Sequence, residues 1–578
     1  MCSRSLSLLR RCRSAAIIYV LFKPPEKMYT ACIYTFGFIP ILSRISPPPH
    51  ENGVSFKSRA NNYAYFMHII SIYIFTFAVI WTIIASSATL CGVFLFMKGS
   101  LDMNKNDALN IIDAKAGMLC AASDEIWGLA ELSLQEYGSE KLYEQFLIKE
   151  GFSVRHGLCS IETAVTGTYG SGHPVIGILA EYDALSGLSQ QGGATVEKPV
   201  PGNPNGHGCG HNLLGAGALG AAIAIKEYLK FTGKSGTVIF YGCPGEEGGA
   251  AKAFFARENE WSKLDAALTW HPDDVNQVVT GSSMACIQKE YIFSGVASHA
   301  AGAPEQGRSA LDAAELMNIG VQFLREHMGK NASVHYAFTD AGGVSPNVVQ
   351  SKAKVLYMIR EATVQDAVKL EARVDKIAQG AALITETQLS TRFIDGTANP
   401  LPLKTMEQLL YKNFTHVALP KYTEEEWAYA AALKNTYESA GLPGYAAKFD
   451  ENIAQTVDKA TDGGKRALND FLMPLYHSSV TLPGSTDVGD VSWQTPTGQI
   501  NCVTAPSMVP GHSWQMVSAG TTGIAHKGML TAAKVLAAAA IDIIDDPALL
   551  PPIRAEFERA SSAGYVCPIP KGAKPEIV

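Results

Sequence analysis

The hydrophobic and polar positions that follow residue 107 have the pattern of an α/β protein. Short apolar runs at Val175–Ala180 and Thr237–Tyr241, bounded by Gly, Pro or acidic residues, predict strands. Between them, the Ala-rich stretch Leu213–Phe231 has apolar residues at helical spacing, as does Ala108–Tyr137. The order strand, helix, strand predicts a parallel sheet with functional residues at the ends of its strands.

A second pattern occupies the middle of the chain. Gln288–Val296 and Ala353–Glu361 have the pattern of strands, whereas Ser309–His327 and Val364–Ala382 have helical spacing. Two such strand–helix units predict a small open sheet with helices on one face. Further helices are predicted in the C-terminal part, at Met406–Phe414, Glu424–Leu433 and Gly523–Ile544. The predicted fold class is therefore α/β, with a central, mostly parallel sheet in a catalytic domain that a smaller α+β domain interrupts.

At 578 residues the chain is longer than one hydrophobic core usually supports. We predict four segments, of which the second and the fourth together form the catalytic domain. They are an N-terminal extension (1–103), the first part of the catalytic domain (104–284), the inserted domain (285–395) and the second part of the catalytic domain (396–578).

The N-terminal extension contains a candidate transmembrane helix at residues 64–97. No Asp, Glu, Lys or Arg occurs from Tyr63 to Met97, and about 20 apolar residues suffice to cross a bilayer. The Lys and Arg residues before it would keep the N-terminus in the cytoplasm and export the enzyme. Two other interpretations stay open: a cleaved signal sequence, or translated upstream sequence with the working start at Met103. We expect a cytoplasmic catalytic domain, with membrane anchoring through residues 64–97 as the alternative.

Composition narrows the range of partners. The net charge of -7 gives no basic surface for a phosphate backbone, so we expect no nucleic-acid partner. The 11 cysteines have no regular spacing, which suits buried thiols in a reducing compartment better than a disulfide framework. Cys209 differs from the others because a histidine lies two residues away.

The residues that carry chemistry follow the predicted strands. Cys209 and His211 lie in the glycine-rich stretch Gly-His-Gly-Cys-Gly-His-Asn, Glu246 and Glu247 lie between Pro-Gly and Gly-Gly, and His271 follows an apolar run. Thiolate, imidazole and carboxylate are the ligands of a borderline-soft divalent metal ion. Such an ion lowers the pKa of bound water towards about 7, and the second of two adjacent carboxylates can accept its proton. The sequence therefore predicts a metallohydrolase site.

These residues resemble the aminoacylase and carboxypeptidase family of co-catalytic metallohydrolases, in the branch that includes auxin-conjugate hydrolases. The resemblance extends from about Asp107 to the C-terminus. It is carried by the motifs above together with Leu179–Leu185, Ser298–Ala301, Gly307–Ala313, Ser345–Val349 and Gly511–Trp514.

The resemblance implies a role for each matching residue. It implies Glu246 as general base and two divalent metal ions in each copy of the chain, zinc or manganese, held by Cys209, His211, Glu247, His271 and His512. Asp183 would support the metal ligands. His526 is a rival to His512, which we favour for its glycine-flanked turn, and Glu181 stands where many members have a histidine ligand or an aspartate.

The resemblance also assigns a role to the inserted segment, as a dimerisation or lid domain. His299 of this domain would reach across the dimer to stabilise the oxyanion, and Asn347 and Arg360 would bind the substrate. An Arg guanidinium suits a substrate carboxylate because it can donate two parallel hydrogen bonds. The partner is either a second copy of the chain, which gives a homodimer, or a related polypeptide, which gives a heterodimer, and the sequence leaves both open.

The expected activity is hydrolysis of the amide bond of an N-acyl or N-aroyl amino acid, with p-aminobenzoyl-glutamate from folate breakdown as the expected substrate. A dipeptidase or a general N-acyl-amino-acid deacylase would use the same residues, because specificity depends on the shape of the pocket. From a different class, a non-catalytic component of a complex or a membrane-anchored binding protein could keep the fold. Such a protein would be expected to lose Glu246 or a metal ligand, and all are present.

Overall fold

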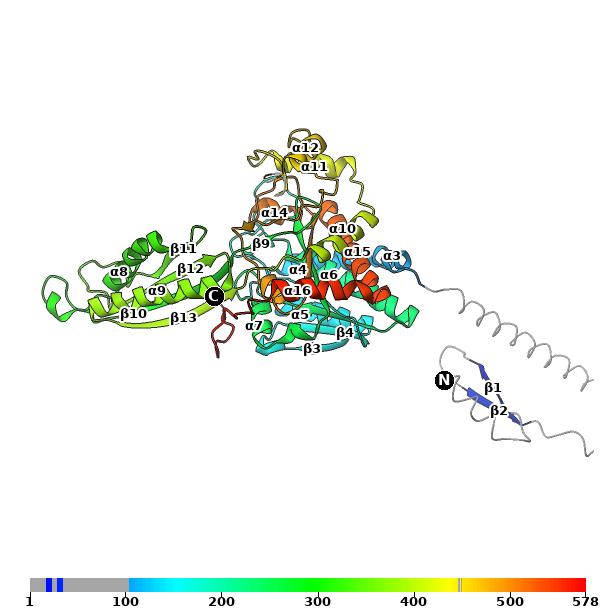
Figure 1. The fold of residues 1–578 in the computed structure, drawn as a ribbon, viewed down its shortest axis with the longest axis horizontal. Helices are drawn as coiled ribbons and strands as arrows, with labels where there is room; N and C mark the ends of the chain where they lie inside the picture. Colours follow the sequence, from blue (N-terminus) through cyan, green and yellow to red (C-terminus); the bar gives the residue numbers. More distant parts are fainter. Residues whose placement is uncertain (1–16, 23–28, 35–102, 445–447, 449, 578) are drawn as a thin grey trace, which may run out of the picture. The chain divides into compact units, whose positions relative to one another are not determined.

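The computed structural model describes residues 17–22, 29–34, 103–444, 448 and 450–577 (Figure 1). The chain divides into two units, residues 1–101 and 102–578. In the first unit, strands β1 (Ile17–Phe22) and β2 (Tyr29–Tyr34) pair antiparallel. The candidate transmembrane helix at 64–97 lies outside the described residues. Among the helices of the described part, none is long and apolar enough to cross a membrane.

The second unit is built on a sheet of seven strands in the order β3-β4-β6-β5-β7-β15-β8. The four strands β6, β5, β7 and β15 run parallel, whereas β3, β4 and β8 pair antiparallel with their neighbours. Their bounds are β3 Ser153–His156, β4 Val165–Ser171, β5 Val175–Ala180, β6 Gly236–Gly242, β7 Ala266–Asp273, β8 Gln277–Val278 and β15 Thr497–Val503.

The sheet is therefore mixed, which corrects the prediction of a mostly parallel one. The segment that joins β3 to β4 contains only the short 3₁₀ turn Leu158–Ser160. A parallel pairing needs a crossover of a dozen or more residues, so a connection this short returns the chain antiparallel. The parallel part is confined to the strands whose connections contain a helix or a long segment.

Helices cover both faces of this sheet. On one face, α6 (His211–Thr232) and α15 (Gly523–Asp545) pack with Ile178 of β5 and Leu268 of β7. On the other face, α7 (Ala251–Arg257) packs with Leu179. Strands that are buried on both faces read as continuous apolar runs, which explains the pattern that the sequence shows at β5 and β6.

The remaining helices surround this core. The predicted helix at Ala108–Tyr137 is in fact two helices, because the backbone at Lys115 leaves helical geometry and Ala130 adopts a left-handed φ of 42°. The helices are α3 Lys105–Ala114, α4 Ala116–Leu129, α5 Tyr137–Glu150, α10 Lys404–His416, α11 Glu424–Lys434, α12 Glu451–Thr461, α13 Val488–Ser492, α14 Trp514–Ala519 and α16 Leu550–Ala560, and a short parallel pair joins β9 (Ser282–Ser283) to β14 (Thr481–Leu482).

The middle of the chain forms a separate lobe, which projects to the left in Figure 1. Four antiparallel strands lie in the order β11-β12-β10-β13, and α8 and α9 pack on one face of them. The sequence predicted β10 and β12 but not the other two strands, because β11 is largely exposed and β13 begins with polar residues. The bounds are β10 Ala285–Ser294, α8 Ala310–Leu324, β11 Ser333–Asp340, β12 Lys352–Glu361, α9 Val364–Thr385 and β13 Gln388–Thr397.

Close packing fixes the position of α6, and glycines make that packing possible. A Cβ atom at Gly215 would lie 2.0 Å from the hydroxyl oxygen of Tyr143 and 2.7 Å from the carbonyl oxygen of Glu181. At Gly217 it would lie 2.8 Å from the indole nitrogen of Trp270. Because His211 is the first residue of α6, this packing also sets the position of His211 against the ends of the strands.

A substitution at Gly215 tests this packing. We expect Gly215→Ala to lower the free energy of unfolding by about 2 kcal/mol, because the added methyl group overlaps its neighbours. The control is Gly380→Ala in α9, where an added Cβ meets nothing within 4 Å. It should raise stability by about 0.5 kcal/mol through the higher helix propensity of alanine. Chemical denaturation of both variants measures the difference, and equal stabilities would contradict the packing argument.

Candidate metal centre

Four of the predicted site residues of the catalytic domain lie at the ends of neighbouring strands. Asp183 follows β5, Glu246 and Glu247 follow β6, and His271 lies near the end of β7. β6, β5 and β7 are adjacent and parallel, so their carboxyl ends meet at the same edge of the sheet. Cys209 lies in the turn before α6, where Gly210 has a φ of 80° that favours glycine.

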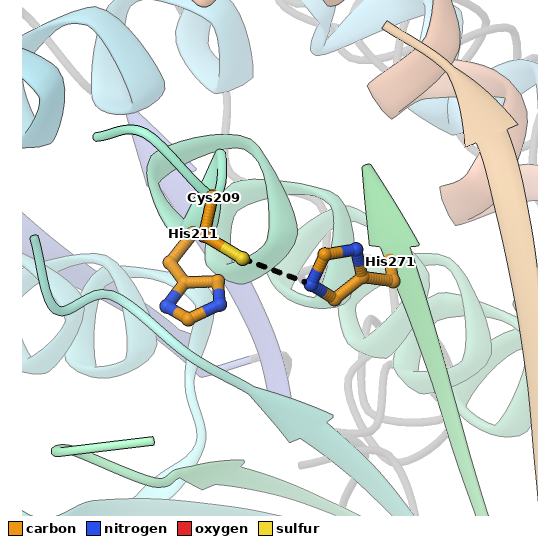
Figure 2. Close-up of side chains that lie close together, drawn as sticks. All are labelled: Cys209, His211 and His271. Atoms are coloured by element: carbon orange, nitrogen blue, oxygen red, sulfur yellow. Dashed lines mark hydrogen bonds between the residues drawn. The ribbon is translucent and has the colours of Figure 1, made fainter. Parts of the chain in front are cut away.

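Cys209, His211 and His271 form the centre of the cluster. Figure 2 shows the Cys209 sulfur between the two imidazole rings, 3.3 Å from Nε2 of His271. The rings of His211 and His271 are nearly perpendicular, with centroids 5.8 Å apart. Soft thiolate and imidazole donors at such spacing match what a zinc-like ion requires.

The potential ligands form three groups, each with its ligand atoms within 4.8 Å of one another. Two groups share the thiol of Cys209, and the third has no cysteine. In full, they are Cys209 with His211 and His271, Cys209 with Glu247 and His512, and Glu181 with His211 and Glu246. All five predicted ligands therefore lie together.

Two buried polar atoms of this cluster make no hydrogen bond to a described residue, as expected of atoms that bind metal ions. His211 Nε2 and Glu247 Oε1 are buried, and no described residue meets hydrogen-bond geometry with either atom, although Glu181 Oε2 lies 3.3 Å from the first and His512 Nε2 lies 3.4 Å from the second. Buried polar atoms are costly to leave unpaired, and both belong to ligand types that a divalent ion accepts. The residues of this cluster therefore fit the divalent metal ions that the sequence predicts.

Asp183 orients His211. Its Oδ1 accepts a hydrogen bond from His211 Nδ1 at 2.8 Å, which directs the other ring nitrogen to the cluster. Its Oδ2 accepts from the Ser133 hydroxyl at 2.8 Å and from the Glu247 backbone N–H at 2.9 Å. Burial alone would raise the pKa of Asp183, but the charge of His211 and these hydrogen bonds outweigh it and lower the pKa to about 2.

The adjacent glutamates have opposite environments. Burial raises the pKa of Glu246 well above its usual range, and the charges of Glu181 and Glu247 add to this effect. Burial acts in the same direction on Glu247, but the polar contact with His512 and the charge of His211 outweigh it and lower the pKa of Glu247. Two neighbouring carboxyl groups with separated pKa values can take different roles.

A buried network of charges lies behind the cluster, and the sequence did not reveal it. Glu181 Oε2 lies 3.3 Å from His211 Nε2, and Glu181 Oε1 lies 2.7 Å from Lys252 Nζ. Lys252 also binds Asp487, and the three side chains are at most 3% exposed. Burial opposes the charge on Lys252, but Asp487 and Glu181 outweigh it and hold its pKa well above its usual range. One sign of this network was present in the sequence: Lys252 is surrounded by alanines and phenylalanines in α7, where a lysine would be buried.

The two rival histidines of the C-terminal part lie in different places. His512 Nε2 is 3.4 Å from Glu247 Oε1, and His512 has a left-handed φ of 51°. His526 lies in α15 with its Nε2 2.8 Å from Asp124 Oδ1, and it belongs to none of the three ligand groups.

The predicted residues of the inserted lobe lie outside the ligand groups. His299 Nδ1 accepts hydrogen bonds from the backbone N–H groups of Ala301 and Gly302 at 3.2 and 3.1 Å. Arg360 Nη1 donates to the Pro483 carbonyl at 3.1 Å and to the Ser485 hydroxyl at 2.8 Å. The Asn347 carbonyl accepts from the Ala300 N–H at 3.0 Å. The single chain therefore does not bring His299, Asn347 or Arg360 into any of the three ligand groups found among the described residues.

A cavity of about 420 Å³ adjoins the cluster. His271 forms part of its wall, as do Pro483 and Ser485, the residues that Arg360 binds. Other walls come from β15, α10 and the segment that follows β13. A cavity of this size, in contact with both a candidate ligand and the residues next to Arg360, suits a small-molecule substrate.

Comparison with known proteins agrees with this geometry. Residues 177–517 match the model of peptidase family M20/M25/M40. The chain therefore belongs to this family, and it is a metal-dependent hydrolase that acts on amide bonds.

Among its relatives, the B subunit of p-aminobenzoyl-glutamate hydrolase of Escherichia coli (strain K12) is 43% identical over 459 residues, which are 78% of this chain and 95% of the relative. The predicted resemblance to the family is confirmed, and the name of this relative contains the substrate that the sequence predicted. Xaa-Arg dipeptidase of Mus musculus is 26% identical over 79% of this chain and 93% of the relative. A putative aminohydrolase from methicillin-resistant Staphylococcus aureus has the same fold, with a TM-score of 0.52 at 15% identity over 76% of this chain and 100% of that chain.

A substitution at Lys252 tests how much its buried ion pairs with Glu181 and Asp487 contribute to stability. We expect Lys252→Met to lower the free energy of unfolding by about 3–5 kcal/mol, because two buried carboxylates lose their counter-charge. The control is Lys263→Met, whose ion pair with Glu260 is at the surface with the lysine side chain 41% exposed, and it should cost less than about 1 kcal/mol. Denaturation of both variants measures this, and similar losses would contradict the assignment.

Proposed function

We propose that the protein hydrolyses the amide bond of an N-acyl or N-aroyl amino acid, with p-aminobenzoyl-glutamate as its substrate. The observation that carries the proposal is the pair of ligand groups that share Cys209, with the carboxyl group of Glu246 beside them. The relative whose name states this activity is 43% identical and covered over 95% of its length, which supports the choice of substrate.

Two divalent metal ions would be held by the two groups that share Cys209. Cys209, His211 and His271 would hold the first, and Cys209, Glu247 and His512 the second. The thiolate favours zinc, while imidazole and carboxylate also suit manganese. When bound, such ions polarise the substrate carbonyl and lower the pKa of water, which supplies a nucleophile at neutral pH.

The residues of the chain perform the proton transfers. Glu246 accepts a proton from the attacking water at a carboxylate oxygen and later delivers it to the nitrogen of the leaving amine. Asp183 keeps the ring of His211 in place through Nδ1. Arg360 lies next to the cavity wall and would bind the carboxylate of the amino-acid half.

His299 would act across a dimer. Because its Nδ1 accepts two backbone hydrogen bonds, the neutral ring carries its proton on Nε2, which is a donor suited to an oxyanion. The named relatives include two different subunits of p-aminobenzoyl-glutamate hydrolase, both from Escherichia coli (strain K12). We therefore propose that the inserted lobe pairs with a second copy of the chain or with a related polypeptide.

A dipeptidase is the second candidate. The Xaa-Arg dipeptidases of Mus musculus and Homo sapiens match this chain over 93% of their lengths. The same metal ligands and the same general base would serve this reaction, so the difference must come from the residues of the cavity. The non-catalytic alternative is set aside, because the chain belongs to a family of hydrolases.

Removal of the general base tests the mechanism. In the full chain loaded with zinc or manganese, we expect Glu246→Gln to lower the release of p-aminobenzoate from p-aminobenzoyl-glutamate by at least about 100-fold, because proton transfer is lost. Both metal ions should remain, as measured by elemental analysis. Glu258→Gln, a change at an exposed glutamate, should leave the rate unchanged. Full activity in Glu246→Gln would refute the assigned role, and a wild type that cleaves only dipeptides would favour the second candidate.

Substitutions on the surface of the inserted lobe test the proposed dimer. Ile319 and Phe323 lie one turn apart on α8 and are 52% and 70% exposed, so they form an apolar patch on the surface of the lobe. We expect the double variant Ile319→Asp and Phe323→Asp to be monomeric in light scattering and to lose activity, since His299 needs a partner. Ile148→Asp on α5, where the isoleucine is 57% exposed, is the matched control and should remain dimeric. An active monomer would contradict the role of His299.

A further inference from the structure

The cavity beside His271 has mainly apolar walls. Apolar side chains from the segments after β8 and β13, from α10, from β14 and from the start of α13 line it, among them Val279, Leu401, Leu403, Met406, Leu410, Leu482 and Val488. His271 also lines it and lies 3.3 Å from the sulfur of Cys209. The cavity therefore adjoins the candidate metal centre through His271.

One carboxylate interrupts these walls. Glu407 lies on α10 between core residues, is only 5% exposed and lines the cavity. Its Oε2 accepts a hydrogen bond from Nδ1 of His477, and no described residue donates to its Oε1. Burial raises the pKa of Glu407, although the hydrogen bond and the charge of His477 oppose this effect. A carboxyl group in an apolar wall is costly, and leucine or methionine would pack there without that cost.

We propose that this cavity binds the acyl half of the substrate, and that Glu407 accepts a hydrogen bond from an amino group at the far end of an aromatic acyl group. The assignment rests on the proposed function and makes it more specific. His477 is a positioning residue, because its hydrogen bond to Oε2 leaves Oε1 for the ligand.

The charges of the cavity support this orientation of the substrate. Apart from His271, the titratable residue among the described residues of its walls is Glu407, so the cavity contains no cation for a carboxylate. The anionic amino-acid half is therefore excluded from it by the charge of Glu407. Arg360, bound to Pro483 and Ser485 at its edge, offers the cation that this half requires. A flat, uncharged ring with a hydrogen-bond donor suits the largely apolar walls and the one carboxylate among them.

The test compares two substrates that differ by one amino group, p-aminobenzoyl-glutamate and benzoyl-glutamate. For the full-length, metal-loaded protein we expect kcat/KM to favour the amino compound by roughly 10- to 100-fold, which is the range for a hydrogen bond to a charged group. Glu407→Met, which keeps the size of the side chain, should abolish this preference, so that the kcat/KM values for the two compounds become equal. Glu558→Met, at an exposed glutamate of α16, is the matched control and should keep the preference.

A binding measurement keeps the test independent of activity. In calorimetry, wild type should bind p-aminobenzoate at least about tenfold more tightly than benzoate, and Glu407→Met should bind both equally. His477→Ala should weaken binding of p-aminobenzoate, and His477→Gln, which retains a donor, should restore part of it.

The outcomes separate the two hypotheses. If wild type cleaves both compounds equally, the role of Glu407 is overturned while the proposed amide hydrolysis stands. If Glu407→Met changes the preference among amino-acid halves instead, the cavity binds that half and the inference is overturned. If neither compound is cleaved and neither product binds, the proposed function fails, and the inference fails with it.

Discussion

The carboxylate of Asp183 is the constraint on which the geometry of the candidate centre depends. It is buried, and its two oxygens bind the ring of His211, the hydroxyl of Ser133 and the backbone of Glu247. These partners come from the start of α6, from the segment after α4 and from the segment after β6. One side chain thus holds three separate parts of the chain together next to the candidate metal ligands.

The buried ion pairs of Glu181, Lys252 and Asp487 also connect parts of the chain that are far apart in sequence. Glu181 and Lys252 precede the inserted lobe in sequence, whereas Asp487 follows it. Removing one partner of a buried ion pair lowers the free energy of unfolding strongly, because the other charge stays buried without a counter-charge. This contact therefore favours one arrangement of the two parts of the domain that the inserted lobe separates in sequence. Its Glu181 oxygen also faces His211, which makes the network part of the surroundings of the metal ligands.

Much of this fold could be predicted from local patterns of apolar and polar residues in the sequence. The apolar runs at β5 and β6 and the helical spacing of α6, α8, α9 and α15 predicted those elements, because burial on both faces or on one stripe leaves a clear periodicity. β11 escaped prediction since its side chains are mostly exposed and carry no alternation. The candidate ligands Cys209, His211, Glu247 and His271 could be predicted because they cluster in motifs next to strands. Lys252, Asp487 and Glu407 were missed because their partners are remote in sequence, and only the folded chain brings such residues together.

The strands that open and close the inserted lobe are neighbours in one sheet. Cys286 near the start of β10 pairs with Thr397 at the end of β13, so the chain leaves the lobe next to the point where it enters. An insertion with adjacent ends adds little loop-closure entropy to the host domain. The lobe is therefore modular: a tight turn could replace it in sequence, and the host sheet would keep its strand order.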